Sequence, residues 1–221
     1  MTYPFVSDDK QRYSALITEE LRQWAAEHYR TRIFFREDKI PVRSGLLYFV
    51  NSGFVRLESS IQSSQNDTNH ELVNTVISFV GADQPIDVFS TEYISFEAIA
   101  QTDRTEVFWA YWSDLEHWPE MKLAVLESLQ FQHQRQLILR SILGQKRTVD
   151  QLFLYIEFLV KLYGEPHPNG RKIPFMLTHD HLASVLGTTR VTVSRLIGQL
   201  KEEEKICIFG EQYIGISSSQ N

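Results

Sequence analysis

Residues 178–206 read THDHLASVLGTTRVTVSRLIGQLKEEEKI, and this pattern predicts two short helices joined by a glycine turn. Thr178 is a good N-cap for the first helix, and Gly187 gives the backbone the freedom that a tight helix exit needs. A second helix follows at once, with Thr188 or Thr189 as its cap. Its apolar residues recur at i, i+3, i+4 and i+7, which predicts a buried face made of Val193, Leu196, Ile197 and Leu200.

The residues that follow decide how this helix pair is interpreted. By itself it could be a surface amphipathic pair, which any helical domain can contain. Residues 207–216 read CIFGEQYIGI, a pattern of two short strands around a Gly-Glu-Gln turn. The hairpin favours a winged helix-turn-helix.

The outer face of the second helix carries Thr189, Arg190, Thr192 and Arg195. In DNA-binding helices the first turns point at base edges, and the arginine fork matches the two acceptors of guanine. The net charge of −6 disfavours nucleic acid in general. Residues 171–205 nevertheless hold six basic and four acidic residues, with the acidic run at the far end of the second helix, so a local positive surface is expected.

The N-terminal half, from about residue 33 to residue 110, has the short Phe-, Tyr-, Val- and Ile-rich runs of an all-β domain. The clearest piece is residues 46–57, two strands joined by a turn in which Gly53 can take a positive φ. Further strands are predicted near residues 72–80, 96–100 and 106–110, and the polar residues 61–70 are predicted to form a hairpin loop. This spacing indicates a small barrel or jelly roll.

A long helix is predicted from about Pro119 to Gly144, with polar residues 131–136 interrupting its apolar stripe. A dimer seam has such an interruption where register or a ligand is specified. The alternative is a helix packed on its own β-domain with a solvated middle. Residues 147–163 form another amphipathic helix, and residues 164–170 are rich in Gly and Pro and predict a loop.

These elements predict an α+β chain of three parts. They are a β-roll with an N-terminal helix at residues 1–118, a central dimerisation helix at 119–145, and a winged helix-turn-helix domain at 146–221. A length of 221 residues with 43% hydrophobic content is enough to form two hydrophobic cores.

The single cysteine, Cys207, excludes an internal disulfide and a four-cysteine iron–sulfur cluster. Residues 1–5 do not look like a signal peptide and no apolar run could span a membrane, so we expect a cytoplasmic protein without a membrane partner.

The order of these elements resembles the cyclic-AMP receptor/FNR (CRP/FNR) superfamily of bacterial transcription regulators. The resemblance covers nearly the whole chain and rests on LYFVNSGFVRL at 47–57 and LGTTRVTVSRLIGQL at 186–200. Within the superfamily, residues 189–196 are most similar to the global nitrogen regulators of cyanobacteria. The resemblance implies a homodimer whose second helices enter successive major grooves, about 34 Å apart, on a palindromic double-stranded DNA site.

The resemblance also implies a role for individual residues. Arg190, Thr192 and Arg195 would read bases and phosphates, and Val191 stands where the cyclic-AMP receptor has a glutamate. Because the carboxylate acceptor for cytosine N4 is lost there, we expect GTA and TAC half-sites. Phosphate contacts that position the protein without reading sequence are expected at Thr178, His179 and Lys201.

The effector is not identified by the sequence. A cyclic-nucleotide pocket of the superfamily needs a Gly-Glu pair and a following arginine, whereas residues 80–98 hold only carboxylates, at Asp83, Asp87, Glu92 and Glu97. Binding of a cyclic nucleotide is therefore disfavoured, and no cofactor is predicted. The nitrogen regulators of the family bind 2-oxoglutarate, which makes it a candidate. Cations on the central helix could serve it or be solvated, and they are Arg135 and Arg140.

Histidines give no metal or haem site. For haem, His70, His117 and His133 are each isolated in polar surroundings, and for a metal, His179 and His181 point in different directions.

The favoured function is a sequence-specific DNA-binding transcription regulator. The alternative is a protein-interaction module of the same architecture that acts through another regulator or RNA polymerase. Four aromatic residues could serve it if they are exposed instead of forming core, namely Trp109, Tyr111, Trp112 and Trp118. No phosphate-binding loop and no nucleophile or zinc-protease signature is present, so we do not expect an enzyme.

Overall fold

The computed structural model describes residues 19–61, 74–86, 90–210 and 212–217. They belong to two compact units, one within residues 11–131 and the other built mainly of residues 132–221.

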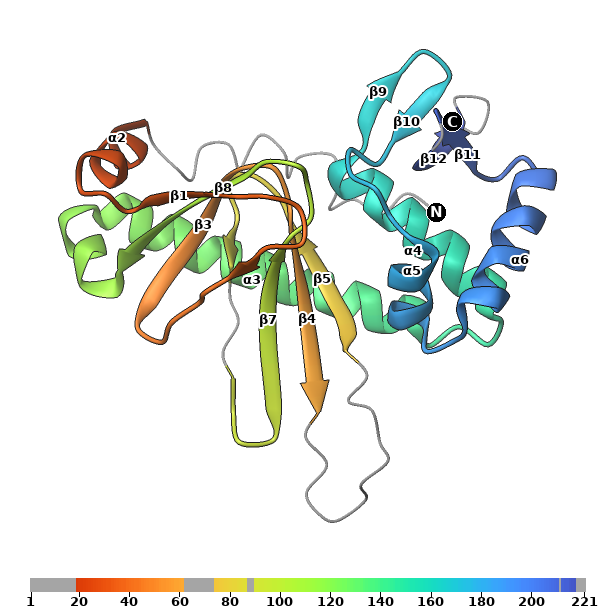
Figure 1. The fold of residues 1–221 in the computed structure, drawn as a ribbon, viewed down its shortest axis with the longest axis horizontal. Helices are drawn as coiled ribbons and strands as arrows, with labels where there is room; N and C mark the ends of the chain where they lie inside the picture. The colour runs from red at the N-terminus through yellow and green to blue at the C-terminus, as the bar shows by residue number, and fades with distance from the viewer. Residues whose placement is uncertain (1–18, 62–73, 87–89, 211, 218–221) are drawn as a thin grey trace. The chain divides into compact units, whose positions relative to one another are not determined.

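The N-terminal unit contains two four-stranded antiparallel sheets (Figure 1). The first has the order β1-β8-β3-β6, with bounds Thr31–Phe34, Thr105–Tyr111, Leu46–Ser52 and Pro85–Ile86. The second has the order β2-β7-β4-β5, with bounds Lys39–Ile40, Ile94–Ala100, Val55–Ile61 and Thr75–Val80. The expected all-β domain of jelly-roll type is confirmed.

The turn at Gly53 carries the chain from one sheet to the other. Its φ of 82° lies in the left-handed region, as the sequence predicts. The strands on either side of it do not pair with each other, because β3 pairs with β8 and β6 while β4 pairs with β7 and β5. Most of the polar segment 61–70 lies outside the described residues.

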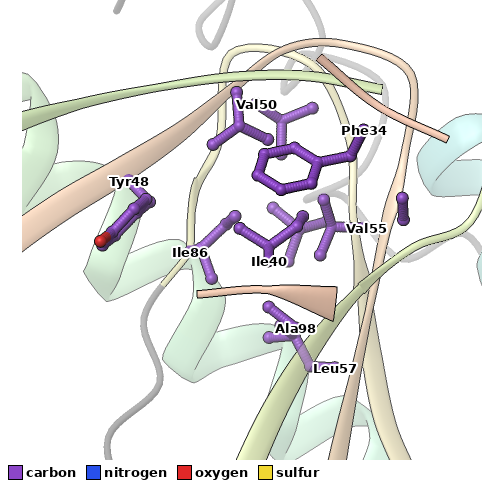
Figure 2. Packing of buried hydrophobic residues seen from close by; sticks show 11 residues of the cluster. Phe34, Ile40, Tyr48, Val50, Val55, Leu57, Ile86 and Ala98 are labelled. Carbon is purple, nitrogen blue, oxygen red and sulfur yellow. The ribbon is translucent and has the colours of Figure 1, made fainter. Parts of the chain in front are cut away.

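Apolar side chains fill the space between the strands. Figure 2 shows Phe34, Ile40 and Val55 close together in this interior. The cluster is buried and also includes Tyr48, Val50, Leu57, Val80, Ile86, Ala98, Ala100 and Val107. Ala98 and Ala100, two positions apart on β7, lie on the same face of the sheet and both belong to this cluster.

Three helical segments of this unit share a second core. They are α2 (Glu19–Glu27), η1 (Trp112–His117) and the beginning of α3 (Pro119–Leu143). The cluster is formed by Leu21, Ala25, Leu47, Phe49, Phe108, Leu115, Met121 and Val125. The predicted central helix is confirmed, with Pro119 at its first position, where a missing N–H costs nothing.

The C-terminal unit packs three helices with a four-stranded sheet. The helices are α4 (Thr148–Tyr163), α5 (His179–Leu186) and α6 (Arg190–Glu202). The sheet order is β11-β12-β10-β9, with bounds Cys207–Phe209, Tyr213–Ser217, Gly170–Lys172 and Glu165–His167.

The prediction of a loop at residues 164–170 is wrong, because β9 and the start of β10 form a hairpin there. Pro166 and Pro168 suggested a break in the chain. An edge strand tolerates proline, however, because its outward N–H needs no partner, and β9 is the edge.

Within the described ranges, the helices are either too short or too polar to cross a bilayer.

Candidate nucleic-acid interface

Side-chain caps fix the two helices of the predicted motif. Thr178 is the N-cap of α5, and its Oγ1 accepts a hydrogen bond from the backbone N–H of His181 at 3.1 Å. Gly187 ends α5 in the left-handed conformation, with φ 60° and ψ 38°. Thr189 is the N-cap of α6 and accepts from the N–H of Thr192 at 3.2 Å. The predicted helix-turn-helix is confirmed in its helices, its turn and its caps.

The apolar face of each helix is buried, which fixes the face that points outward. In α5 the buried side chains are Leu182, Ala183, Val185 and Leu186. In α6 they are Val193, Leu196, Ile197 and Leu200, as predicted. Both helices also pack against α4.

The first turns of α6 present two arginines and a valine. The side chain of Arg190 is 71% exposed, and its guanidinium lies 3.8 Å from the carboxylate of Asp180. An exposed pair at this distance contributes little stability and leaves most of the guanidinium N–H groups available. Arg195 is exposed, and its side chain makes no hydrogen bond or ion pair with any residue that the structure describes. Val191 is 79% exposed.

The hydroxyl groups of the motif bond to one another. Thr192 Oγ1 lies 3.0 Å from Thr189 Oγ1, so both threonines take part in the cap. His179 Nδ1 lies 2.8 Å from Ser194 Oγ and so links the N-terminus of α5 to α6. Ser194 and Asp180 were missed by the sequence analysis, although Ser194 is one helical turn after Arg190 and shares its face.

The charges along α6 are arranged as the sequence predicts. The acidic residues 202–204 lie at its C-terminal end, beside the exposed Lys201. Glu203 forms an ion pair of 2.7 Å with Lys205, and the hydrogen bonds from Lys205 and Gln199 lower the pKa of Glu203. The N-terminal end, where α6 has no acidic residue in its first turn, is therefore the electropositive end.

The predicted wing is confirmed. Strands β11 and β12 pair antiparallel from Cys207 opposite Gly215 to Phe209 opposite Tyr213. On the far side of β12, β10 brings Lys172, whose ammonium lies 5.0 Å from the ring centre of Tyr213.

Two of the four carboxylates predicted to disfavour a cyclic nucleotide form ion pairs, while Glu92 is exposed. Asp83 forms an ion pair with Arg22, and Glu97 Oε1 lies 2.6 Å from Lys39 Nζ. Asp87 and the haem candidate His70 lie outside the described residues. Among the described residues, no group of three or more His, Cys, Asp or Glu side chains could hold a metal ion.

Two comparisons of sequence show what the chain is similar to. Residues 156–218 match the Crp-like helix-turn-helix domain family. The chain is 31% identical over 94 residues to the Global nitrogen regulator of Synechocystis sp., and 31% identical over 90 residues to that of Synechococcus elongatus. These alignments cover 42% and 41% of this chain and only 42% and 40% of the two regulators.

Solved structures share the fold of the whole chain. A cyclic nucleotide-binding domain containing protein from Listeria monocytogenes matches with a TM-score of 0.71 at 15% identity, covering 97% of this chain and 100% of that one. A CRP-family transcriptional regulator from Thermus thermophilus matches with a TM-score of 0.65 at 17% identity, covering 85% and 92%. The chain therefore has the fold of the CRP/FNR-family transcription regulators, is related to the global nitrogen regulators of cyanobacteria, and carries a Crp-like helix-turn-helix domain.

Proposed function

We propose that this chain is a sequence-specific DNA-binding transcription regulator that acts as a homodimer on a palindrome with GTA and TAC half-sites. The observation that carries the proposal is the outward face of α6, where Arg190 and Arg195 are exposed while the opposite face is buried. Two arginine forks on the first turns of an anchored helix are suited to guanine edges in a major groove. Thr178, His179 and Lys201 lie on or beside α5 and α6 and would position the helix through phosphates.

A dimer is supported by α3. Three of its leucines are exposed, namely Leu123, Leu126 and Leu137. Their spacing fits the a and d positions of heptads, the pattern of a helix that pairs with a second helix. Polar Gln130 and His133 occupy the intervening seam positions and could specify the register.

The regulator does not depend on a cyclic nucleotide in this proposal. The β-roll interior is filled by apolar side chains, and the cations near residues 80–98 are already paired with carboxylates. For 2-oxoglutarate the candidate cations are Arg135, which lies 5.9 Å from the ring centre of Tyr163, and the exposed Arg140.

The test is a fluorescence-anisotropy titration of the full chain with a GTA/TAC palindrome and with a scrambled duplex, at one fixed salt concentration. Preferential binding of the palindrome is expected, and Arg195→Ala should weaken it by roughly 1–3 kcal/mol. Arg104→Ala removes an exposed cation of the N-terminal unit and serves as the control. Equal affinity of wild type and Arg195→Ala for the palindrome would refute the role of Arg195.

The same titration repeated with 2-oxoglutarate tests the effector. A rise in affinity for the palindrome with 2-oxoglutarate, and none with cyclic AMP, is expected if the nitrogen-regulator resemblance extends to the ligand.

One observation favours the alternative, a module that acts through RNA polymerase or another regulator. Tyr111 and Trp112 are 50% and 42% exposed, whereas Trp109 and Trp118 pack against the two cores. Salt separates the two functions. The affinity of a DNA reader falls steeply as salt rises, while a protein-binding module shows no salt-dependent binding of a duplex.

A further inference from the structure

Val191 has the most exposed large hydrophobic side chain among the described residues of the C-terminal unit. Its exposure is not explained by folding. A β-branched residue loses side-chain entropy in a helix, and the first turn of a helix favours an acidic residue. Packing does not explain it either, because the buried face of α6 is made by Val193, Leu196, Ile197 and Leu200.

The surroundings of Val191 are suited to a base edge. Arg190 precedes it in the chain, and Arg195 follows one turn later on the same face of α6. The hydroxyls of Thr189 and Thr192 bond to each other in the cap. The apolar surface of Val191 is thus flanked by two exposed cations.

We infer that Val191 contacts the 5-methyl group of a thymine in the major groove, next to the base pair that Arg195 reads. This inference rests on the proposed DNA-binding function. Thymine is the one base that presents a methyl group in that groove, and a valine side chain can neither donate nor accept a hydrogen bond. Val191 therefore selects thymine through apolar contact, and the T of a GTA half-site is the expected partner.

Deoxyuridine tests this contact, because it differs from thymidine only by the missing 5-methyl group. Each thymine of the palindrome is replaced singly, and affinity is measured by anisotropy with wild type and with Val191→Ala. For wild type, replacing the thymine at one position per half-site should lower the affinity for the duplex about fourfold, which corresponds to the free energy of burying one methyl group. For Val191→Ala, thymine and deoxyuridine at that position should bind equally well. Thymines outside the half-sites provide the matched control.

The outcomes separate this inference from the proposed function. If wild type does not prefer the GTA/TAC palindrome, a site is first selected from random duplexes and the scan is made on that site. If no site is selected, the proposed function fails and the inference fails with it. If a site is bound but no thymine shows the effect, or Val191→Ala keeps it, the inference alone is overturned. Melting curves of Val191→Ala confirm that the variant is folded.

Discussion

Arg56 is the only charged residue among the buried residues of the described chain. Its guanidinium donates to both oxygens of Glu37 at 3.1 and 2.7 Å, to Glu58 at 2.6 Å and to Gln101 at 2.6 Å. Burial would lower the pKa of Arg56, but the hydrogen bonds to Glu37 and Glu58 outweigh it and raise the pKa. The cation is thus held by a network in which each of its three guanidinium nitrogens donates a hydrogen bond.

Replacing Arg56 should therefore make the N-terminal unit much less stable to unfolding. Arg56→Met leaves the Glu58 side chain, which is 12% exposed, without its cation. We expect a loss of about 3–5 kcal/mol in the free energy of unfolding, measured by urea denaturation. Arg104→Met breaks the ion pair of the exposed Arg104 with the half-buried Glu106 and should cost no more than about 1 kcal/mol. Equal losses for the two variants would contradict the importance of the buried network.

Asp83 gives a pH-dependent prediction. Burial raises its pKa in spite of the ion pair with Arg22. A carboxyl whose pKa is raised on folding contributes most stability in acid, and this contribution is lost as the pH rises through the folded-state pKa. Asparagine tolerates the φ of 65° at this position. The free energy of unfolding of Asp83→Asn should therefore rise relative to that of wild type as the pH rises from about 3.5 to 7.

The measurement is urea denaturation of both proteins across that pH range. Asp103→Asn is the control, since its carboxylate is exposed and paired with Arg36 on the surface. A stability difference between wild type and Asp83→Asn that does not change with pH would show that burial does not govern this carboxyl.

At the scale of elements, local signals predicted the helix pair and missed pairing between distant segments. Thr178, Gly187 and Thr189 act on the backbone within four residues of themselves, so their caps and turn could be predicted. The β9–β10 hairpin depends on β12, which lies more than forty residues away in sequence and completes the sheet. In the same way, the partners of β3 and β4 are set by β7 and β8, so the assignment of the two strands to different sheets could not be predicted from residues 46–57.

The two turn glycines should respond differently to alanine. A Cβ at Gly187 would meet nothing within 4 Å. Gly187→Ala should therefore lower the free energy of unfolding only by the cost of holding alanine in the left-handed conformation, roughly 1–2 kcal/mol. A Cβ at Gly53 would lie 2.5 Å from Thr102 Oγ1 and 2.6 Å from the carbonyl oxygen of Arg104. Gly53→Ala should therefore destabilise its unit considerably more. Thermal denaturation compares the two, and a larger loss for Gly187→Ala would contradict the geometry.

The ion pair between Asp180 of α5 and Arg190 of α6 leads to a prediction about DNA affinity. Asp180 places a carboxylate 3.8 Å from Arg190, on the face proposed to meet DNA. Asp180→Asn removes a negative charge that repels phosphate, so it should tighten binding of palindrome and scrambled duplex alike, with a larger gain at low salt. Glu120→Gln, an exposed change of the same kind on α3, should leave affinity unaltered. Weaker binding by Asp180→Asn would show that the ion pair orients Arg190 for reading.

At the scale of the whole molecule, the site residues could be proposed because all of them lie on or beside the two helices of one local motif, α5 and α6. The fold of the β-roll could be predicted as a class, because strand periodicity indicates it. The effector could not be predicted. Asp83 pairs with Arg22 and Glu97 pairs with Lys39, and because the partners lie about sixty residues apart in the sequence, these pairs could not be recognised from it. Carboxylates that repel a ligand and carboxylates that hold the fold have the same appearance in a sequence.

In the proposed function, palindrome binding depends on dimerisation through α3. Leu126→Glu combined with Leu137→Glu places charges on the exposed seam while the buried face of α3, with Met121, Val125 and Ser128, is untouched. The variant should stay folded and sediment as a monomer. Because the second half-site is then bound without the help of the first, affinity for the palindrome should fall by about a hundredfold or more, while affinity for a single half-site is retained. Ser113→Glu adds charge at an exposed position of η1 and should change neither property. A variant that still sediments as a dimer would exclude this face of α3 as the seam.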